Sequence, residues 1–349
     1  MMMKALLIQQ KMIGDVLTAS LHCAYLKRWN PSLEIHFVAN QHTLAVLENN
    51  PNIDKIIIFR DDFRSNKLSF LSFLWKQRKE PYDYIIDFYG KIESNLIALF
   101  TPAKTKISYH KWYTSWVYPT PVKRSNNSLT QLPLSLHHRN QLILPLVGDD
   151  FNFNDFPRLY LNKQEVQQAK KTIAHRDPQK KLLMVAVLGS SKLKTYPLNQ
   201  LADMLDYLCQ NYPVQLIFNY MPQQQGQVNE LIERLNKFTM DQLLFDSAPK
   251  SLRQYIGLVS QCDAVLGNEG GAINMGKAAG IPSFAIFSPQ IEKQGWHNDN
   301  PRHYAVHLND YFPEAIHKNI NEKHIQQLYA QFNFTLFKNK LAAFLQQLF

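Results

Sequence analysis

Three short stretches of this 349-residue chain combine glycines with polar and charged side chains that could act on a phosphorylated ligand. The richest is residues 264–289, in which a short apolar run ends at Gly267 and a glycine-rich turn follows. A helix-compatible segment closed by Gly280 comes next, and a second apolar run occupies 283–287. This order predicts a strand, a turn, a helix and a strand, with the turn directing backbone N–H groups at a ligand.

The turn itself could hold a diphosphate, because the start of a helix attracts anions through unpaired N–H groups. Those groups would belong to Gly270, Gly271 and Ala272. A diphosphate repels Glu269, so this side chain is expected to bind a sugar hydroxyl or to orient the turn. A nucleotide sugar is therefore the leading candidate ligand, and the alternative is a turn in which the glycines only supply unusual backbone angles.

The second stretch, residues 188–197, follows the first strand expected in the second half of the chain. Gly189 and Ser190 could approach phosphate oxygens, and Lys192 and Lys194 supply positive charge. The spacing of glycine and lysine is not that of a Walker A motif. An ordinary solvated loop remains the alternative.

The third stretch, residues 9–16, directly follows the first expected strand and contains Gly14 and Asp15. Gly14 would allow a tight turn, and Asp15 would lie at the start of the next helix. Asp15 could be an N-cap, a role for which aspartate is common. It could also be a carboxylate at the carboxyl end of a strand that acts as a general base.

Charged residues after the third strand, Arg60, Arg64 and Lys67, could contact an acidic acceptor. The alternative is an ordinary solvated surface, which is the usual place of mixed charge. The segment His137-His-Arg139 lacks the spacing of a metal site, and we expect no metal there.

The composition favours a folded protein that attracts anions. Hydrophobic residues make up 45% and aromatic residues 12% of the chain, and the formal net charge is +10. The positive charge is spread thinly, which argues against nucleic acid and leaves an anionic membrane surface or a phosphorylated substrate. Three distant cysteines suit a reducing cytosol, and no apolar run is long enough for a signal peptide or a membrane span.

Strand-like and helix-like segments alternate along both halves of the chain. Strands are expected at 5–8, 34–39, 56–59, 84–87, 182–188, 214–218, 243–245, 264–266 and 283–287. Helices are expected at 16–29, 44–48, 68–77, 93–100, 198–211, 228–236, 252–260 and 325–349. We expect a long loop over 108–136 and the connection between two domains within 149–180. The pattern predicts two doubly wound α/β domains that face each other across a cleft.

Together these segments resemble family 9 of the glycosyltransferases, the lipopolysaccharide heptosyltransferase group. The resemblance rests on Gly14-Asp15-Val16, on the Gly189-Ser-Ser…Lys194-x-Tyr-Pro197 loop, and on Gly267-Asn-Glu-Gly-Gly271 through Phe287-Ser-Pro289. These three anchors match in order and spacing over nearly the whole chain.

The resemblance implies a GT-B fold of two Rossmann-like domains. The first would be an acceptor domain over 1–160, the second a nucleotide-sugar domain over 178–330, and the C-terminal helix, 331–349, would cross back to the first. The family inverts the anomeric centre and needs neither metal nor cofactor, so the departing diphosphate must be stabilised by backbone amides and a lysine.

By resemblance, Asp15 is the catalytic base, which favours this role over that of a helix N-cap. Lys194 would neutralise the donor phosphate. The donor-binding residues implied are Gly14, Gly189, Ser190, Lys194, Glu269, Gly270, Gly271, Ala272 and Asn274. Acceptor binding is assigned to Arg60, Arg64 and Lys67. The family usually has Asp at 269 and often His at 274, and it commonly has an acidic residue soon after the strand at 214–218, where this chain has none before Glu230.

The function expected is transfer of a sugar, by family default heptose from ADP-heptose, to a lipopolysaccharide-type core. The enzyme would work at the cytoplasmic face of the inner membrane, with the aromatic-rich segment 108–124 docking on an anionic glycolipid. The alternatives are a nucleotide-sugar-binding protein without activity and a GT-B enzyme of different sugar specificity.

Overall fold

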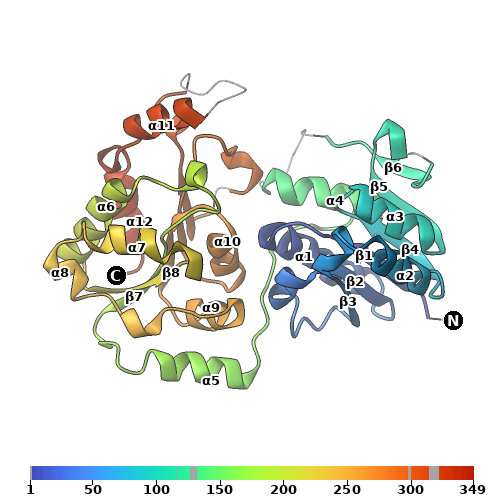
Figure 1. The fold of residues 1–349 in the computed structure, drawn as a ribbon, viewed down its shortest axis with the longest axis horizontal. Helices are drawn as coiled ribbons and strands as arrows, with labels where there is room; N and C mark the ends of the chain where they lie inside the picture. The colour runs from blue at the N-terminus through green and yellow to red at the C-terminus, as the bar shows by residue number, and fades with distance from the viewer. Residues whose placement is uncertain (1, 115, 126–131, 298–299, 314–321) are drawn as a thin grey trace. The chain divides into compact units, whose positions relative to one another are not determined.

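The computed structural model describes residues 2–114, 116–125, 132–297, 300–313 and 322–349. Contacts within the chain divide it into two compact units, Met1–Tyr160 and Leu161–Phe349. Each unit is built on one parallel β-sheet covered by helices, as the alternation of segments predicts (Figure 1). None of the described helices is both long and apolar enough to cross a membrane.

The sheet of the first unit has six parallel strands in the order β3-β2-β1-β4-β5-β6. The strands are β1 (Lys4–Ile8), β2 (Glu34–Asn40), β3 (Lys55–Phe59), β4 (Tyr82–Asp87), β5 (Ala103–Tyr109) and β6 (Thr120–Val122). The central strand β1 is almost wholly apolar and buried, as expected of a parallel strand covered on both faces. It pairs with β2 and β4, so that Ile8 is in register with Val38 and Asp87.

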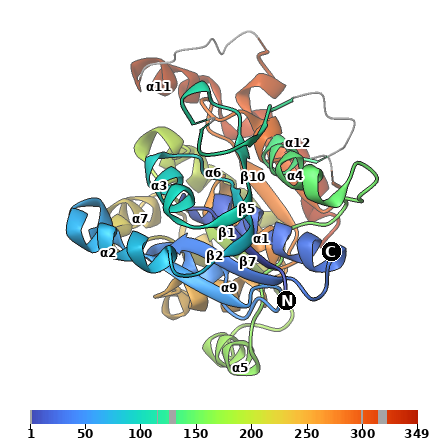
Figure 2. The ribbon, with the colours of Figure 1, turned by 90° about the vertical axis from the view of Figure 1, so that its right-hand side faces the viewer.

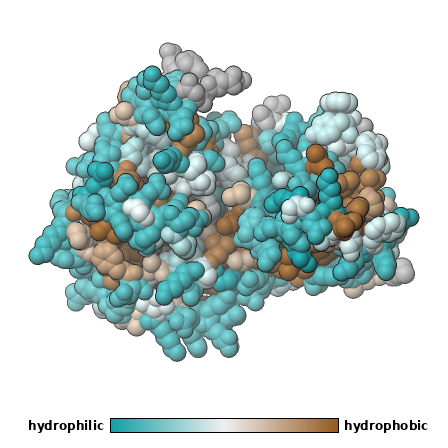
Figure 3. Space-filling view, in the orientation of Figure 1, coloured by the Kyte–Doolittle hydropathy of each residue, from teal (hydrophilic) through white to brown (hydrophobic). Residues whose placement is uncertain are grey.

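Four α-helices cover this sheet. They are α1 (Ile13–Trp29), α2 (Lys67–Gln77), α3 (Ile92–Phe100) and α4 (Leu134–Val147). Helices α2 and α3 pack together on one face, and α1 and α4 pack together on the other (Figures 1 and 2). Short 3-10 turns add η1 (Gln41–Val46), η2 (Asp61–Arg64) and η3 (Trp112–Thr114). Apolar residues also reach the surface of this unit, over α2 and α3 (Figure 3).

The prediction of a long loop over 108–136 is only partly correct. This segment contains the end of β5, strand β6 and the start of α4, while residues 115 and 126–131 lie outside the described part of the chain. Helix α4 was not expected because its buried side carries the polar residues Arg139 and Asn140 beside Leu142 and Ile143. Those polar groups find partners on α1, so the helix lacks the apolar stripe on which prediction depends.

The sheet of the second unit has five parallel strands in the order β11-β10-β9-β7-β8. They are β7 (Lys181–Ala186), β8 (Val214–Asn219), β9 (Ala264–Asn268), β10 (Ser283–Ile286) and β11 (His303–Val306). Strand β11 was not expected. The strand expected at 243–245 is wrong, because Leu243 makes only an isolated bridge to Leu216 before the turn η6 (Phe245–Ser247).

Most helices expected in the second unit are present, but the single helix expected over 325–349 is wrong, because a 3-10 turn at Phe334–Leu336 divides it in two. The helices of this unit are α5 (Lys163–Thr172), α6 (Leu198–Asn211), α7 (Gln225–Ile232), α8 (Lys237–Met240), α9 (Leu252–Val259), α10 (Gly271–Ala278), α11 (Glu322–Gln331) and α12 (Lys338–Leu345). The short turns are η4 (Lys192–Lys194), η5 (Pro222–Gln224), η7 (Lys293–Gly295), η8 (Leu308–Asp310) and η9 (Phe334–Leu336). Helix α5, which lies in the expected connection, packs on α9 and pairs its Glu165 with Arg253.

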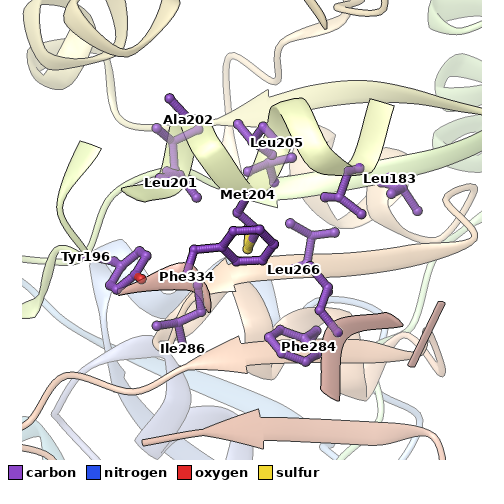
Figure 4. Packing of buried hydrophobic residues seen from close by; sticks show 14 of the residues in the cluster. Leu183, Tyr196, Leu201, Ala202, Met204, Leu205, Leu266, Phe284, Ile286 and Phe334 are labelled. Atoms are coloured by element: carbon purple, nitrogen blue, oxygen red, sulfur yellow. The ribbon is translucent and has the colours of Figure 1, made fainter. Parts of the chain in front are cut away.

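The core of the second unit includes the end of the chain. Side chains from β7, β9 and β10, such as Leu183 and Phe284, pack with helix α6 and with aromatic residues of the tail (Figure 4). Phe337 and Phe344 of the tail are fully buried there, and both contact Phe284. The segment 331–349, which we expected to pack on the first domain, belongs to the second unit, and its apolar side chains are part of that unit's core.

This packing predicts that Phe344→Ala destabilises the second unit by about 3–5 kcal/mol, because it leaves a cavity among well-packed aromatic rings. Urea unfolding followed by tryptophan fluorescence and circular dichroism would measure the loss. The matched control is Phe349→Ala, at an exposed position, which should change stability by less than about 1 kcal/mol. Equal effects of the two substitutions would contradict the placement of the tail.

Candidate functional site

Asp15 of the first unit lies where the carboxyl end of β1 passes into helix α1. It is the third residue of α1, with Met12 as the N-cap. A carboxylate in the first turn of a helix is stabilised by the positive end of the helix dipole. The chain thus places one nearly buried acidic group at the edge of the sheet where parallel α/β folds bind their ligands.

Arg139 of α4 holds the Asp15 carboxylate in place. The Arg139 Nη2 donates to Asp15 Oδ1 at 2.8 Å, and both side chains are almost completely buried. Lys11 approaches the same oxygen at 3.7 Å. Arg139 is fixed in turn by a hydrogen bond from its Nη1 to the Ser135 carbonyl. Both cations approach Oδ1, and these contacts orient the carboxylate.

The interpretation of Asp15 as an N-cap is wrong. Met12 has the extended backbone of a cap residue but makes no side-chain cap hydrogen bond. Gly14 is also helical rather than part of a tight turn, and its carbonyl accepts a hydrogen bond from Thr18. The carboxylate is therefore available for a role other than capping.

A second polar contact joins α1 and α4, about two turns further along α1. The ring Nε2 of His22 lies 3.0 Å from Asn140 Oδ1, and both residues are buried. Burial, together with the charge of the neighbouring Arg139, lowers the pKa of His22 to about 3. A neutral His22 and the Arg139–Asp15 pair thus fix the position of α4 against α1.

A second carboxylate at this edge, Asp87 at the end of β4, is completely buried. Its Oδ1 accepts from the backbone N–H groups of Tyr89 and Gly90, and Tyr118 donates to its Oδ2 at 2.5 Å. Burial raises the pKa of Asp87 against these hydrogen bonds. With every oxygen in use, Asp87 holds the loop after β4 and the segment around Tyr118 rather than acting on a substrate.

The three residues predicted to bind the acceptor follow β3 and are exposed. Arg60 forms two hydrogen bonds of 2.9 Å with Asp62. Arg64 lies 3.7 Å from Glu93 of α3, and Lys67 is the first residue of α2. Two of the three cations are therefore already paired with carboxylates on the protein's own surface.

In the second unit, residues 189–196 form a compact loop after β7, which we call the lysine loop. Gly189 is required there, because a Cβ would lie 2.2 Å from the Lys194 carbonyl oxygen. The Gly189 N–H donates to the Thr195 hydroxyl at 3.1 Å. Ser190 is exposed, and Lys194 ends the turn η4.

Asn268, the last residue of β9, ties the lysine loop to the glycine turn, residues 267–271. Its Nδ2 donates to the carbonyls of Ala186 and Val187 at 3.2 and 2.7 Å, and its Oδ1 accepts from the Tyr196 N–H at 2.6 Å. The side chain is buried. Gly267 has a φ of +118°, and a Cβ there would meet the Ala186 carbonyl at 2.5 Å.

The glycine turn brings two cations near one carboxylate. Glu269 bonds to the Asn274 side chain, and its charge interacts with Lys194 and Lys277. Burial raises the pKa of Glu269, although both lysines oppose this. Burial also lowers the pKa of Lys277 to about 8, against the effect of Glu269. The structure thus groups the predicted residues Lys194, Glu269 and Asn274 and adds Lys277.

The start of α10 supplies the N–H groups expected to hold an anion. Helix α10 begins at Gly271 with Gly270 as its N-cap, and no side chain caps it. Its first turn is fixed by Tyr255, which donates to the Ala272 carbonyl at 2.8 Å. The first N–H groups of a helix have no partner inside the helix, so they remain for an anionic ligand.

Four residues that contribute here were not singled out from the sequence: Arg139, Asp87, Asn268 and Lys277. Lys277 is the one charged residue of α10, which is otherwise made of small, apolar and amide side chains. Asn268 is a polar residue at the end of a buried strand. A lone charged residue in such a helix and a polar residue at the end of such a strand are patterns that could have marked Lys277 and Asn268 as candidate site residues.

One group of potential metal ligands occurs among the described residues, at the opposite edge of the first sheet. One ligand atom from each of Glu34, His36 and Glu80 lies within 4.8 Å of the others. Lys4 approaches Glu34 and Glu80 at 3.3 and 3.4 Å, and Lys55 binds Glu80 at 3.0 Å. The lysines already neutralise these carboxylates, so the group fits an ion-pair network better than a metal site.

Comparison with known proteins identifies the family. The model of glycosyltransferase family 9 (heptosyltransferase) matches residues 71–319. The chain belongs to this family. It is 21% identical over 300 residues to lipopolysaccharide heptosyltransferase 1 of Campylobacter coli, an alignment that covers 82% of this chain and 84% of the relative.

Solved structures of the family share the fold. ADP-heptose lipopolysaccharide heptosyltransferase II of E. coli superposes with a TM-score of 0.72 at 15% identity, covering 99% of both chains. An E. coli heptosyltransferase with ADP-2-deoxy-2-fluoro heptose gives a TM-score of 0.67 at 13% identity, covering 87% of this chain and 93% of the other. The expected GT-B class of fold, with two parallel-sheet α/β domains, is confirmed.

The buried ion pair of the first unit predicts a non-additive pattern of stability. Arg139→Met should cost about 3 kcal/mol or more, because it leaves the Asp15 carboxylate nearly buried without its main partner. The double variant Asp15→Asn/Arg139→Met should lose less than Arg139→Met alone, because no unpaired carboxylate remains. Urea unfolding of the wild type, of Asp15→Asn and Arg139→Met, and of the double variant would measure this, and additive losses would contradict it.

The contacts of Asn268 predict that Asn268→Asp destabilises the second unit by about 2 kcal/mol or more, because a carboxylate oxygen would face two carbonyl oxygens. Thermal and urea unfolding would measure the loss. The control Asn229→Asp makes the same chemical change on the exposed side of α7 and should be nearly neutral.

Proposed function

We propose that this protein transfers heptose from ADP-heptose to a lipopolysaccharide-type core acceptor, in one displacement that inverts the anomeric centre and needs no metal. Family membership and the Campylobacter relative support a lipopolysaccharide acceptor, and the E. coli heptosyltransferase bound to an ADP-heptose analogue supports the donor. The observation that carries the mechanism is the position of Asp15, at the carboxyl end of β1 and oriented by Arg139.

In the proposed reaction Asp15 takes the proton of the acceptor hydroxyl. The hydroxyl oxygen then forms a bond to the anomeric carbon, while the bond from that carbon to the diphosphate oxygen breaks. The diphosphate leaves with the electron pair of that bond. Because attack and departure occur on opposite sides of the carbon, the anomeric configuration inverts.

The second unit would stabilise the departing diphosphate. Tyr255 holds the first turn of α10, with the N–H groups of Gly271 and Ala272, and Asn268 holds the loop that carries Lys194. Little reorganisation would therefore be needed as charge develops. We assign Glu269 and Asn274 to hydroxyls of the donor sugar, since a carboxylate beside a diphosphate is otherwise repelled.

The acceptor would bind on the first unit. Arg60, Arg64 and Lys67 are proposed to contact its acidic groups, which requires the first two to exchange their carboxylate partners. The aromatic segment after β5 exposes Trp112 and Trp116, and we propose that it docks on the glycolipid. The enzyme would then act at the cytoplasmic face of the inner membrane.

The test is Asp15→Asn, assayed with ADP-heptose and a lipid A–Kdo acceptor. Turnover should fall by about 10²–10⁴-fold, because the base is lost, while calorimetry should give an affinity for ADP-heptose within about twofold of the wild type. The matched control is Asp150→Asn, at an exposed carboxylate of the same unit. NMR of the product would establish its anomeric configuration, and a chelator should leave the rate unchanged.

Each alternative has its own outcome. Wild-type protein that binds ADP-heptose but forms no product would indicate a binding protein without activity. Product formed only from GDP- or UDP-linked sugars would indicate a different donor. Full turnover by Asp15→Asn would show that another group is the base.

A further inference from the structure

Helices α2 and α3 of the first unit expose a row of large apolar side chains, which we call the apolar face. It consists of Leu68, Leu71 and Trp75 on α2 and Ile92 and Leu99 on α3. Leu68 and Ile92 are 79% and 74% exposed, and Trp75 is 56% exposed. Apolar residues gather over these two helices in the space-filling view (Figure 3).

This row is separate from the side of α2 that packs on the sheet. Phe73 and Leu74 point into the core of the first unit, beside Phe59 and Ile97. The residues of the apolar face on α2 are spaced at i, i+3 and i+7, so they form one stripe on the outer side. A helix that is apolar on both sides needs a second apolar environment besides its own core.

The two helices form one continuous surface. Trp75 packs edge-on against Phe100 of α3, with their ring centroids 6.4 Å apart. Both helices start near the carboxyl edge of the sheet, where Arg64 of η2 and Glu93 of α3 approach at 3.7 Å. The most exposed residues, Leu68 and Ile92, lie at these helix starts. The apolar face therefore begins at the edge that carries Asp15.

The surroundings of the apolar face are cationic. Residues 67–79 contain four basic side chains and no acidic one: Lys67, Lys76, Arg78 and Lys79. The Arg78 guanidinium lies 5.3 Å from the centre of the Trp75 ring. Lys91 precedes α3. Exposed apolar side chains ringed by lysine and arginine are typical of helices that lie in the interface of an anionic bilayer.

The nearby acidic groups are already paired with other cations. Glu80 binds Lys4 and Lys55, and Glu93 faces Arg64. Asp61 and Asp62 pair with Arg64 and Arg60 on the preceding turn. The positive charge beside the apolar face is thus not cancelled by these carboxylates.

We infer that the apolar face is the surface by which this protein docks on an anionic lipid bilayer, with α2 and α3 lying along the plane of the lipid headgroups. The inference rests on the proposed function in that a glycolipid acceptor is membrane-bound. The apolar side chains enter the headgroup boundary, and the lysines bind lipid phosphate. This brings the carboxyl edge of the first unit to the lipid surface, where a membrane-anchored acceptor is presented.

The test is flotation of the full chain with vesicles of phosphatidylethanolamine and phosphatidylglycerol, without donor or acceptor. The wild type should float with these vesicles, float much less with phosphatidylcholine alone, and dissociate as salt is added. Leu68→Ser/Leu71→Ser should weaken binding by about tenfold or more, and Lys76→Glu/Lys79→Glu by a similar factor.

Matched controls come from the second unit. Phe238→Ser/Phe245→Ser alters two aromatic residues that are also more than half exposed, and Lys170→Glu/Lys171→Glu makes the same charge change on α5. Both controls should bind vesicles as the wild type does. Circular dichroism and thermal unfolding of every variant would separate weaker binding from loss of the fold.

A second assay keeps the two proposals distinguishable. Transfer to a deacylated, water-soluble acceptor should be unchanged in Leu68→Ser/Leu71→Ser, whereas transfer to acceptor in vesicles should fall. Failure of the wild type to bind anionic vesicles, or equal losses in variants and controls, would overturn the docking surface without affecting the proposed reaction. Vesicle binding without any transfer would overturn the proposed function and keep the docking surface.

Discussion

The carboxamide of Asn268 is the contact on which the candidate donor site depends. A carboxamide can donate and accept at once, and Asn268 uses both abilities to join the end of β7, the lysine loop and the glycine turn. Two glycines make this approach possible, since a side chain at Gly189 or Gly267 would collide with backbone atoms. One buried amide and two absent side chains therefore hold the lysine loop against the ends of β7 and β9.

In the first unit, a pair of opposite charges, Arg139 and Asp15, positions the polar group at the edge of the sheet. The sheet of this unit ends beside Asp15 and Asp87, and two nearby carboxylates need different environments if they are to do different things. Arg139 faces Asp15 from α4, whereas Asp87 is enclosed by two backbone N–H groups and the Tyr118 hydroxyl. The first arrangement pairs the carboxylate with a cation of another helix, and the second uses the carboxylate to hold a loop.

The sequence was sufficient for the two-sheet plan, because buried parallel strands are short apolar runs and the helices between them are regularly spaced. It was sufficient for the glycine turn, where an apolar strand ends in glycines. It was insufficient for α4, whose inner side is polar, and for Arg139, whose partner is 124 residues away. For the tail, the phenylalanines indicate burial but not which surface buries them. The second carboxylate, Asp87, was missed because nothing local distinguishes a buried loop anchor from an ordinary strand end.

The buried apolar residues of α12 also affect how the protein is made. The sheet of the second unit begins at β7, yet Leu341, Phe344 and Leu345 are among the residues that fill its core. During synthesis the first unit has all its strands and helices long before this helix leaves the ribosome, and domains generally fold as units, amino-terminal first. The second unit must wait with an incomplete core until its last helix is released. Chains truncated ahead of α12 would therefore carry a finished first unit attached to an aggregation-prone partner.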